Sequence, residues 1–348
     1  MPDDAEVVRL LKDGYWDRTA VVRMRSGELR VRKEHRPSED VGPWALESLR
    51  REIRYLKGLE AIERDLFPEL LDAWGAEDGS PLAGYDMPYF EGWRDLGGVV
   101  TQAGSKLAPE DARSLECRIS AMVIDTLHSE VPVTKPMSQH VRDVVELVFG
   151  RLANRDPFSE IINAETIEVD RNTFPGLRPC FETISSYGLL EQLDLGPQVR
   201  LHGDLILENV LWNPATATQS VIFIDPVSVA GATAGPPLFD LVKYESYASG
   251  ELYSIRSGNT AGGVLDGSGY HLTRDPLDPG VVAFRNGRWG QEYRKSHVDR
   301  YGHPDPALYH LLDGYFSLAM AVNTTGSQPL TRLLSAVLAF AAACKDAS

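Results

Sequence analysis

The sequence predicts an α+β protein built from two lobes: a small N-terminal antiparallel sheet with one helix, and a larger, mainly helical C-terminal lobe. Its length of 348 residues is about twice that of a typical domain. Short β-type runs surround a single helical pattern at the start of the chain, whereas helical spacing dominates after residue 96. We therefore expect an N-terminal lobe over 1–92, a hinge at 87–92, and a C-terminal lobe over 93–348.

Runs of β-branched and aromatic residues predict the strands of the first lobe, at 7–11, 20–24, 29–33, 67–74 and 83–90. Ser26-Gly27 is typical of a tight turn between the second and third runs. Leucine and isoleucine at three- and four-residue spacing predict a helix over 44–59, directly after Pro43. The expected order is three strands, one helix and two strands.

The same spacing predicts the helices of the second lobe, at 114–128, 141–152, 181–193, from about 237, 304–322 and 330–344. Short buried strands are expected at 199–201 and 221–224. Asn286-Gly287 predicts a hairpin over 281–293, because this dipeptide favours two-residue hairpin turns. The Gly- and Asp-rich stretch 257–279 is expected to be a long loop.

Composition excludes several classes of protein. The formal charge is −15 and the chain has no Lys/Arg-rich run, which argues against a nucleic-acid partner. Three widely spaced cysteines form neither a disulfide framework nor a zinc cluster, as expected in a reducing compartment. The N-terminus is acidic, unlike a secretory signal, and the longest apolar stretch, 333–344, is shorter than the ~20 residues of a membrane span. We expect a soluble, cytoplasmic protein without a membrane partner.

The most informative motif is His202-Gly203-Asp204-Leu205 with Asn209 four residues later, which has the form H-x-D-L-x-x-x-N. Asp225 follows sixteen residues after Asn209, at the end of an apolar strand. Phosphoryl transfer needs a carboxylate that orients and deprotonates the attacking hydroxyl, and oxygen ligands for magnesium. The alternative is a turn in which Asp204 and Asn209 only cap the backbone. The flanking strands and Asp225 favour the catalytic interpretation.

With this motif the chain resembles the aminoglycoside phosphotransferases and related antibiotic and metabolite kinases, which share the protein-kinase fold. The resemblance runs from about Val7 to Ala341, but only 202–225 is specific. It implies that Asp204 is the catalytic base, that Asn209 and Asp225 bind Mg²⁺, and that ATP or GTP is the phosphoryl donor. It also implies that Asp240, in Phe239-Asp240-Leu241, braces the catalytic loop; His202 is expected to support the same loop.

Lys33 ends the third predicted strand, where the family has the lysine that contacts the α- and β-phosphates. Alternation with Leu29 and Val31 places it on the buried face of the sheet, where a lysine needs an anionic partner. Glu52 on the following helix is the expected partner, and Glu47 is the alternative. Taken alone, Lys33 is equally compatible with a surface strand position.

Pro88-Tyr89-Phe90 resembles the family's hinge between the lobes. Adenine would bond the C=O of Pro88 and the N–H of Phe90, which is compatible with proline because proline keeps its carbonyl. The alternative is that these residues only connect the end of a strand to a glycine-containing turn.

Two departures from the family pattern matter. The turn expected to cover the phosphates, 13–19, has one glycine, Gly14, in place of a Gly-rich run. Pro226-Val227 follows Asp225 where protein kinases have Phe-Gly, which favours a constitutively assembled small-molecule kinase.

The resemblance places acceptor binding in the C-terminal lobe, in the insert before the catalytic loop and in the final helices, and we expect segment 131–198 to line that site. The segment has ten acidic and six basic residues, a mild excess that an aminoglycoside would favour but that a solvated surface also explains. Aromatic and histidine residues nearer the C-terminus could instead stack on a nucleoside-type acceptor: Tyr270, His271, Trp289, Tyr293 and His297.

The sequence therefore leaves the acceptor open. The first hypothesis is an antibiotic phosphotransferase that confers resistance or self-protection. The second is a metabolite kinase acting on a sugar, a choline-like molecule or an amino alcohol. A protein kinase or an inactive kinase-like binding module is the alternative of a different class. The intact set of Asp204, Asn209 and Asp225 argues against the inactive module.

Overall fold

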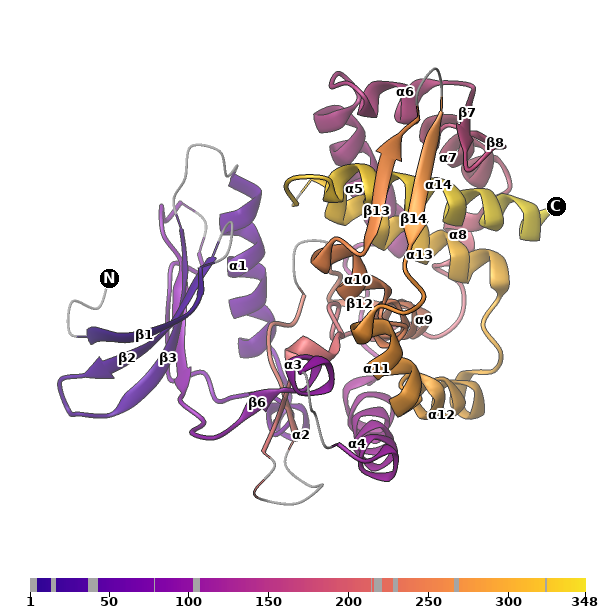
Figure 1. The fold of residues 1–348 in the computed structure, drawn as a ribbon. Coiled ribbons are helices and arrows are strands. Elements are labelled where there is room, and N and C mark those ends of the chain that lie inside the picture. Colours follow the sequence, from indigo (N-terminus) through magenta and orange to yellow (C-terminus); the bar gives the residue numbers. More distant parts are fainter. Residues whose placement is uncertain are drawn as a thin grey trace.

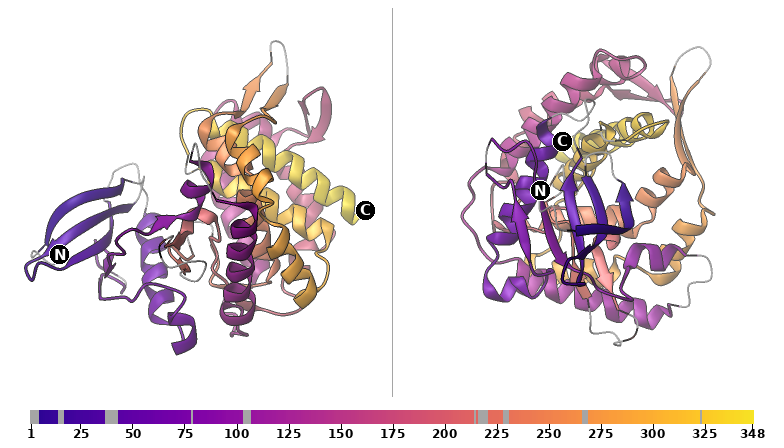
Figure 2. Two further views of the ribbon diagram at one scale, coloured as in Figure 1. Left: turned by 60° about the horizontal axis from the view of Figure 1, so that its bottom comes forward. Right: turned by 90° about the vertical axis from the view of Figure 1, so that its left-hand side faces the viewer.

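A computed structural model of the chain describes residues 5–13, 17–36, 43–77, 79–102, 107–213, 215, 221–227, 231–265, 269–322 and 324–348. It has the expected two lobes, a sheet with one long helix and a larger helical body (Figure 1). The N-terminal sheet lies to one side of the helical lobe (Figure 2). Of the phosphate-covering turn 13–19, residues 14–16 lie outside the described residues.

The N-terminal sheet is antiparallel and has the strand order β1-β2-β3-β5-β4. Its strands are β1 (Ala5–Asp13), β2 (Asp17–Met24), β3 (Leu29–His35), β4 (Asp72–Trp74) and β5 (Gly84–Pro88). Helix α1 (Pro43–Lys57) contacts β3 and β5 and buries Leu49, Ile53 and Leu56 in the core, as the spacing predicts. In the register, Lys33 lies opposite Thr19 on one side and Tyr85 on the other.

The strand expected at 67–74 is shorter than predicted. Pairing starts only at Asp72, because Phe67 is buried beneath the catalytic loop and Pro68 has no N–H to donate to a ladder. A short helix that the sequence pattern did not indicate, α2 (Ala61–Arg64), precedes this strand. Glu60 and Glu63 form a capping box at its start.

The C-terminal lobe is mainly helical. Its helices are α3 (Leu96–Thr101), α4 (Pro109–Ala121), the π-helix η1 (Met122–Leu127), α5 (Met137–Leu152), α6 (Phe158–Asn163), α7 (Leu177–Ser186), α8 (Leu189–Gln192), the 3₁₀-helix η2 (Leu207–Asn209), α9 (Leu238–Ala248), α10 (Glu251–Ser257), α11 (Pro279–Gly287), α12 (Gln291–Tyr301), α13 (Pro306–Ala321) and α14 (Gln328–Ala347). Helices α13 and α14 pack against each other along their length and form the centre of the lobe (Figure 1).

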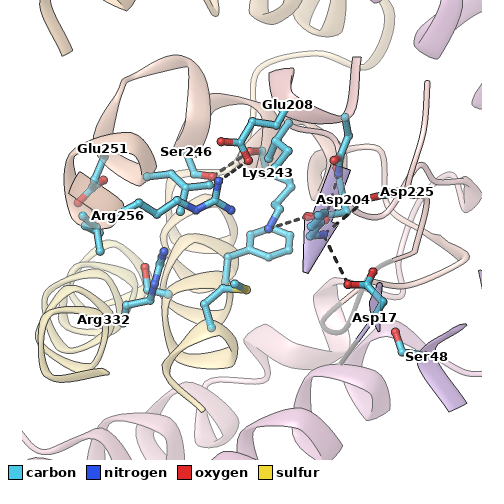
Figure 3. A pocket seen from close by; sticks show the side chains of 18 of the residues that line it. Asp17, Ser48, Asp204, Glu208, Asp225, Lys243, Ser246, Glu251, Arg256 and Arg332 are labelled. Carbon is cyan, nitrogen blue, oxygen red and sulfur yellow. Dashed lines mark hydrogen bonds and ion pairs between the residues drawn. The ribbon is translucent and has the colours of Figure 1, made fainter. Parts of the chain in front are cut away.

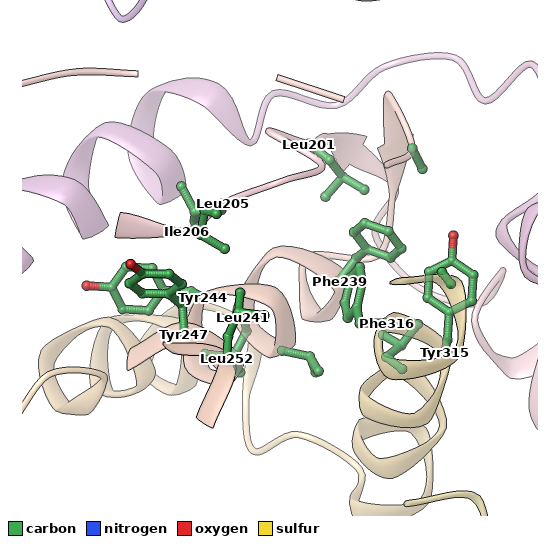
Figure 4. Packing of buried hydrophobic residues seen from close by; sticks show 14 of the residues in the cluster. Leu201, Leu205, Ile206, Phe239, Leu241, Tyr244, Tyr247, Leu252, Tyr315 and Phe316 are labelled. Carbon is green, nitrogen blue, oxygen red and sulfur yellow. The ribbon is translucent and has the colours of Figure 1, made fainter. Parts of the chain in front are cut away.

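Small sheets complete this lobe. Strands β10 (Val210–Trp212), β11 (Val221–Phe223) and β6 (Arg94–Asp95) form one, and β9 (Val199–Arg200) pairs with β12 (Ala234–Gly235). A four-stranded sheet joins β7 (Thr166–Val169) and β8 (Asn172–Pro175) to β13 (Thr260–Val264) and β14 (Tyr270–Arg274). The core beneath the catalytic loop contains aromatic side chains of α9 and α13, among them Phe239, Tyr315 and Phe316 (Figure 4).

The hairpin predicted at 281–293 is wrong, because this segment is α11 and the start of α12. Asp278 caps α11 by accepting hydrogen bonds from the N–H groups of Gly280 and Val281, and Pro279 occupies the first helical turn. Asn286-Gly287 then ends a helix, with Arg288 in the left-handed conformation at φ 56°. The hairpin of this region is β13–β14, which lies within the predicted loop 257–279.

No helix among the residues described is both long enough and apolar enough to span a bilayer.

Candidate active site

The catalytic loop, 201–209, is held in place by Asp240 at the start of α9. Asp240 Oδ2 accepts a hydrogen bond from the N–H of His202 at 2.8 Å, and Oδ1 accepts one from Gly203 at 2.9 Å. His128 Nε2 lies 3.2 Å from the same carboxylate. Gly203 has φ 77°, and a Cβ there would lie 2.5 Å from the carbonyl oxygen of Ala232. Asp240 therefore makes the bracing contacts that the sequence predicts.

His202 lies beneath the loop and is fully buried. Its ring stacks on Phe67 at 5.9 Å and meets Phe223 edge-on at 5.6 Å. Its Nδ1 accepts a hydrogen bond from the N–H of Asp204 at 3.3 Å, and its carbonyl accepts one from Val227 at 2.7 Å. Burial lowers the pKa of His202, against the opposing charge of Asp240, so the ring is neutral near pH 7. His202 thus supports the loop through packing and backbone bonds.

Asp204 is oriented from two sides. Asn209 Nδ2 donates to its backbone carbonyl at 2.8 Å and to Oδ2 at 3.2 Å. Lys243 Nζ lies 2.9 Å from Oδ1 and 4.9 Å from the ring centroid of Phe316. Both carboxylate oxygens of Asp204 therefore have a defined partner, and the carboxylate faces the cavity between the lobes.

Lys243 is a site residue that the sequence analysis missed. Its side chain is 6% exposed, and it lies three residues after Asp240, on the same face of α9. Asp240 therefore holds the loop backbone while Lys243 contacts the carboxylate that the loop presents. The three-residue spacing from Asp240 was the only signal that pointed to it.

Lys33 forms the ion pair with Glu52 that the sequence predicts. Its Nζ lies 2.9 Å and 2.8 Å from the two carboxylate oxygens of Glu52, and Tyr85 donates its O–H to Glu52 Oε1 at 2.8 Å. Glu47, the alternative partner, pairs with Arg54 at the surface. The contact is confirmed, whereas the role of Lys33 and Glu52 toward a nucleotide stays a prediction.

Asp225 joins this buried cluster from the C-terminal lobe. Its Oδ1 lies 3.0 Å from Lys33 Nζ, and its Oδ2 lies 3.9 Å from Lys12 Nζ. Burial alone would raise the pKa of Asp225, but Lys33 and Lys12 together lower it to about 2. Burial alone would lower the pKa of Lys33, but the carboxylates of Asp225 and Glu52 raise it well above the usual value. Both groups are therefore charged at neutral pH.

A third carboxylate, that of Asp17, was not anticipated. Its Oδ2 lies 3.5 Å from Lys33 Nζ, and its buried Oδ1 has no hydrogen-bond partner. Asp17 opens β2 and lies within the segment 13–19 that is expected to cover the phosphates. Burial raises the pKa of Glu52 to about 7, against the charge of Lys33, so this carboxylate of the cluster is only partly charged at neutral pH.

The backbone at Asp225 is in the left-handed region, with φ 53°, and Val227 has φ 48°. Positive φ is costly for residues other than glycine, above all for a β-branched one, and such strain concentrates at functional sites. The turn is tied to the catalytic loop, because Ile224 N–H donates to the carbonyl of Asn209 at 2.9 Å. Asn209 and Asp225 are thereby held beside each other, on adjoining stretches of backbone.

These side chains line one cavity of about 260 Å³ between the lobes (Figure 3). Lys33, Glu52 and Asp17 line the side formed by the N-terminal lobe, and Asp204, Asn209 and Asp225 line the floor. The remaining wall comes from α9, α10, α13 and α14 and carries Lys243, Arg256, Asp313, Phe316 and Arg332. The described residues contain no group of three or more His, Cys, Asp or Glu side chains arranged to hold a metal ion.

Other predicted residues lie elsewhere. Pro88 ends β5 opposite Arg30, and the Phe90 ring lies 5.1 Å from Trp93; neither is among the described residues that line the cavity. Segment 131–198 contributes none of the described lining residues either, because α5 and α7 pack behind the wall against α13 and α14. The cavity therefore gives no support to the prediction that this segment lines the acceptor site.

The aromatic residues considered for acceptor stacking are structural in their contacts. Tyr293 is buried and stacks on Tyr244 at 4.6 Å. Tyr270 is buried and donates its O–H to Glu160 at 2.6 Å. Neither these two nor His271, Trp289 and His297 are among the described residues lining the cavity beside Asp204.

Comparison with known proteins gives similarity to solved structures only. No protein-family model and no curated protein matches the sequence. A structure described as a fructosamine-3-kinase from Thermobifida fusca YX-ER1 is 14% identical, with 96% of this chain and 94% of that chain covered and a TM-score of 0.46. A glucosamine kinase in complex with glucosamine, ADP and inorganic phosphate is 14% identical, with 96% and 93% covered and a TM-score of 0.43.

A macrolide 2'-phosphotransferase type I is 16% identical, with 97% of this chain and 93% of that chain covered and a TM-score of 0.45. All three structures are described as kinases or phosphotransferases. At such low identity, the activity of this chain has to be argued from the geometry of its own site.

Proposed function

We propose that this protein is a magnesium-dependent small-molecule kinase that transfers the γ-phosphoryl group of ATP or GTP to a hydroxyl group. The observation that carries the proposal is the convergence of Asp204, Asn209, Asp225 and Lys33 on one cavity between the lobes. Phosphoryl transfer requires this combination of a base, oxygen ligands for a cation and a fixed positive charge for the phosphates.

Asp204 is the base in this proposal. It accepts the proton of the attacking hydroxyl and aligns that oxygen with the transferred phosphorus. Lys243 and Asn209 fix the orientation of its carboxylate, through contacts of 2.9 Å and 3.2 Å. The loop itself is fixed by Asp240, so the base is positioned before any substrate arrives.

Asn209 and Asp225 would hold Mg²⁺, and their chemistry fits that ion. Magnesium prefers oxygen ligands, takes few of them from the protein and completes its shell with phosphates and water. When bound, the ion neutralises charge that develops on the transferred phosphoryl group.

Lys33 would contact the nucleotide phosphates, and Glu52 would hold the lysine in place. For the adenine, we retain the pairing with the carbonyl of Pro88 and the N–H of Phe90 as part of the proposal.

The acceptor would bind beside Asp204, against α9, α10, α13 and α14. This wall carries positive and negative side chains together, among them Arg256, Arg332, Glu251 and Asp313. A polycationic aminoglycoside would need clustered carboxylates, so it suits this wall less well than a metabolite or an antibiotic without multiple positive charges.

The test is a phosphoryl-transfer screen with purified protein, Mg²⁺ and either ATP or GTP. The acceptors are hydroxylated antibiotics, sugars, sugar acids, sugar phosphates and amino alcohols, and ³¹P NMR identifies any phosphate ester. We expect an ester with at least one class of acceptor and none when Mg²⁺ is removed by a chelator. Failure to bind Mg²⁺-nucleotide in calorimetry, together with no ester from any acceptor, would contradict the proposal.

A further inference from the structure

The acceptor wall contains a buried arginine that forms no ion pair with the described residues. Arg332, on α14, is 4% exposed and lines the cavity. Its Nε and Nη2 atoms are buried without a hydrogen-bond partner, and no carboxylate of the described residues forms an ion pair with it. A buried guanidinium without a partner is destabilising, because no ion pair compensates for the loss of its hydration. A bound anion would compensate the buried charge of such a group.

A second arginine, Arg256, lies near Arg332, and its charge is paired with a carboxylate. Figure 3 shows Arg332 and Arg256 on the same side of the cavity, formed by α10 and α14, away from Asp17 and Asp225. Arg256 is paired with Glu208 in the catalytic loop, and Tyr247 donates its O–H to the same carboxylate at 2.9 Å. Burial and the charge of Arg256 together lower the pKa of Arg332 to about 10, so the group is still charged at neutral pH.

The acidic side chains of this wall do not neutralise Arg332. The negative charge of Glu251 raises the pKa of Arg332 and so opposes the effect of Arg256. Glu251 forms its own ion pair with Arg274, at 3.8 Å. Asp313 is half-buried, and desolvation together with the charge of Glu251 raises its pKa to about 7, so it is only partly charged at neutral pH. Arg256 is paired with Glu208, so Arg332 is the arginine of this wall whose guanidinium has no ion-pair partner among the described residues.

We propose that the acceptor carries an anionic group, a carboxylate or a phosphoryl group, which Arg332 binds together with Arg256. This inference rests on the proposed function, since it assigns the substrate class of the same site. Guanidinium groups bind both kinds of anion through paired N–H donors. With the anion held at α14, the rest of the molecule extends along the wall toward Lys243, and one of its hydroxyl groups meets Asp204. The site then selects hydroxy acids or sugar phosphates and rejects polycations.

The test compares four sugars that share one ring: glucose, glucosamine, glucuronate and glucose 6-phosphate. Calorimetry measures their binding while Mg²⁺ and a nonhydrolysable ATP analogue fill the nucleotide site. We expect at least one of the two anions to bind about tenfold or more tightly than glucose. Preference between glucuronate and glucose 6-phosphate distinguishes a carboxylate from a phosphoryl group. Arg332→Gln should abolish the preference for the anion, and Arg332→Lys should retain part of it.

Arg285→Gln is the matched control, because Arg285 is exposed on α11 and is not among the cavity residues. Thermal unfolding of each variant shows that it is folded. Equal affinity for glucose and both anions in the native protein, tighter binding of glucosamine, or an anion preference that survives in Arg332→Gln would overturn the inference.

The same four sugars also separate this inference from the proposed function. Anion binding that depends on Arg332, but without phosphoryl transfer to any acceptor, would refute the kinase and keep the anion site. Phosphoryl transfer that prefers glucose or glucosamine would support the kinase and refute the anion site.

Discussion

Lys243 reaches Asp204 from a helix that lies 39 residues further along the chain, and its contribution can be measured separately from that of the catalytic loop. Lys243→Met keeps the length of the side chain and removes its charge. We expect kcat to fall about tenfold to a hundredfold, because Asp204 loses one of its two orienting contacts, while nucleotide affinity stays unchanged. Steady-state kinetics with a saturating acceptor measures the effect.

Lys295→Met is the control for this change, because Lys295 pairs with Asp299 on the exposed face of α12 and is not among the described residues that line the cavity. A kcat of Lys243→Met equal to that of the native enzyme would show that Lys243 does not help to orient Asp204.

Lys33 offers a test of the nucleotide site at the residue scale. Lys33→Ala should weaken binding of Mg²⁺-ATP much more than binding of adenosine, because the lysine is proposed to contact the phosphates and not the base. Glu52→Gln should cause a smaller loss of the same kind, since it frees the lysine without removing it. Calorimetry with both ligands gives the comparison. Equal losses for ATP and adenosine would place Lys33 outside the phosphate site.

Asp225→Ala should remove the dependence of nucleotide affinity on Mg²⁺, because Asp225 is the only anionic ligand proposed for the ion. Titrations of ATP with and without Mg²⁺ measure this dependence. If the variant binds Mg²⁺-ATP as tightly as the native protein, the cation is held by other groups.

At the scale of the element, α14 carries an arginine whose buried charge is expected to lower stability. Arg332→Met should therefore raise the melting temperature in the absence of ligand, because methionine fills similar space without a charge to desolvate. The same substitution should weaken anion binding. Differential scanning calorimetry provides the measurement. A lower melting temperature would show that Arg332 stabilises the folded protein.

Short-range sequence patterns predicted strand β3 and helix α1. Alternation in β3 placed Lys33 on the buried face, and the helical spacing of α1 placed Glu52 beside it, at 2.8 Å. Asn286-Gly287 was misread because the left-handed conformation that suits a hairpin turn also ends a helix. In that case the helix cap at Asp278 and Pro279 outweighed the turn signal.

At the scale of the whole molecule, the catalytic loop was predictable because its motif is contiguous, from His202 to Asn209, with Asp225 soon after. The resemblance implies acceptor binding at the final helices, but the residues of the wall were not predictable, because it is assembled from α9, α10, α13 and α14 through packing between distant segments. No local pattern marks Arg332 as a cavity residue, since it lies in an apolar helix that could face any neighbour. The resemblance and the length of segment 131–198 suggested it as part of the wall, whereas its helices α5 and α7 pack against α13 and α14 behind the wall.

The most direct test of the central claim, that this cavity transfers phosphoryl groups with Asp204 as the base, is the kcat of Asp204→Asn. The substitution keeps the size of the side chain and removes the proton acceptor. We predict that folding and Mg²⁺-nucleotide affinity stay as in the native protein, while kcat with the best acceptor of the screen falls by several decades. A variant that keeps more than about a tenth of the native kcat at saturating substrates would contradict the account.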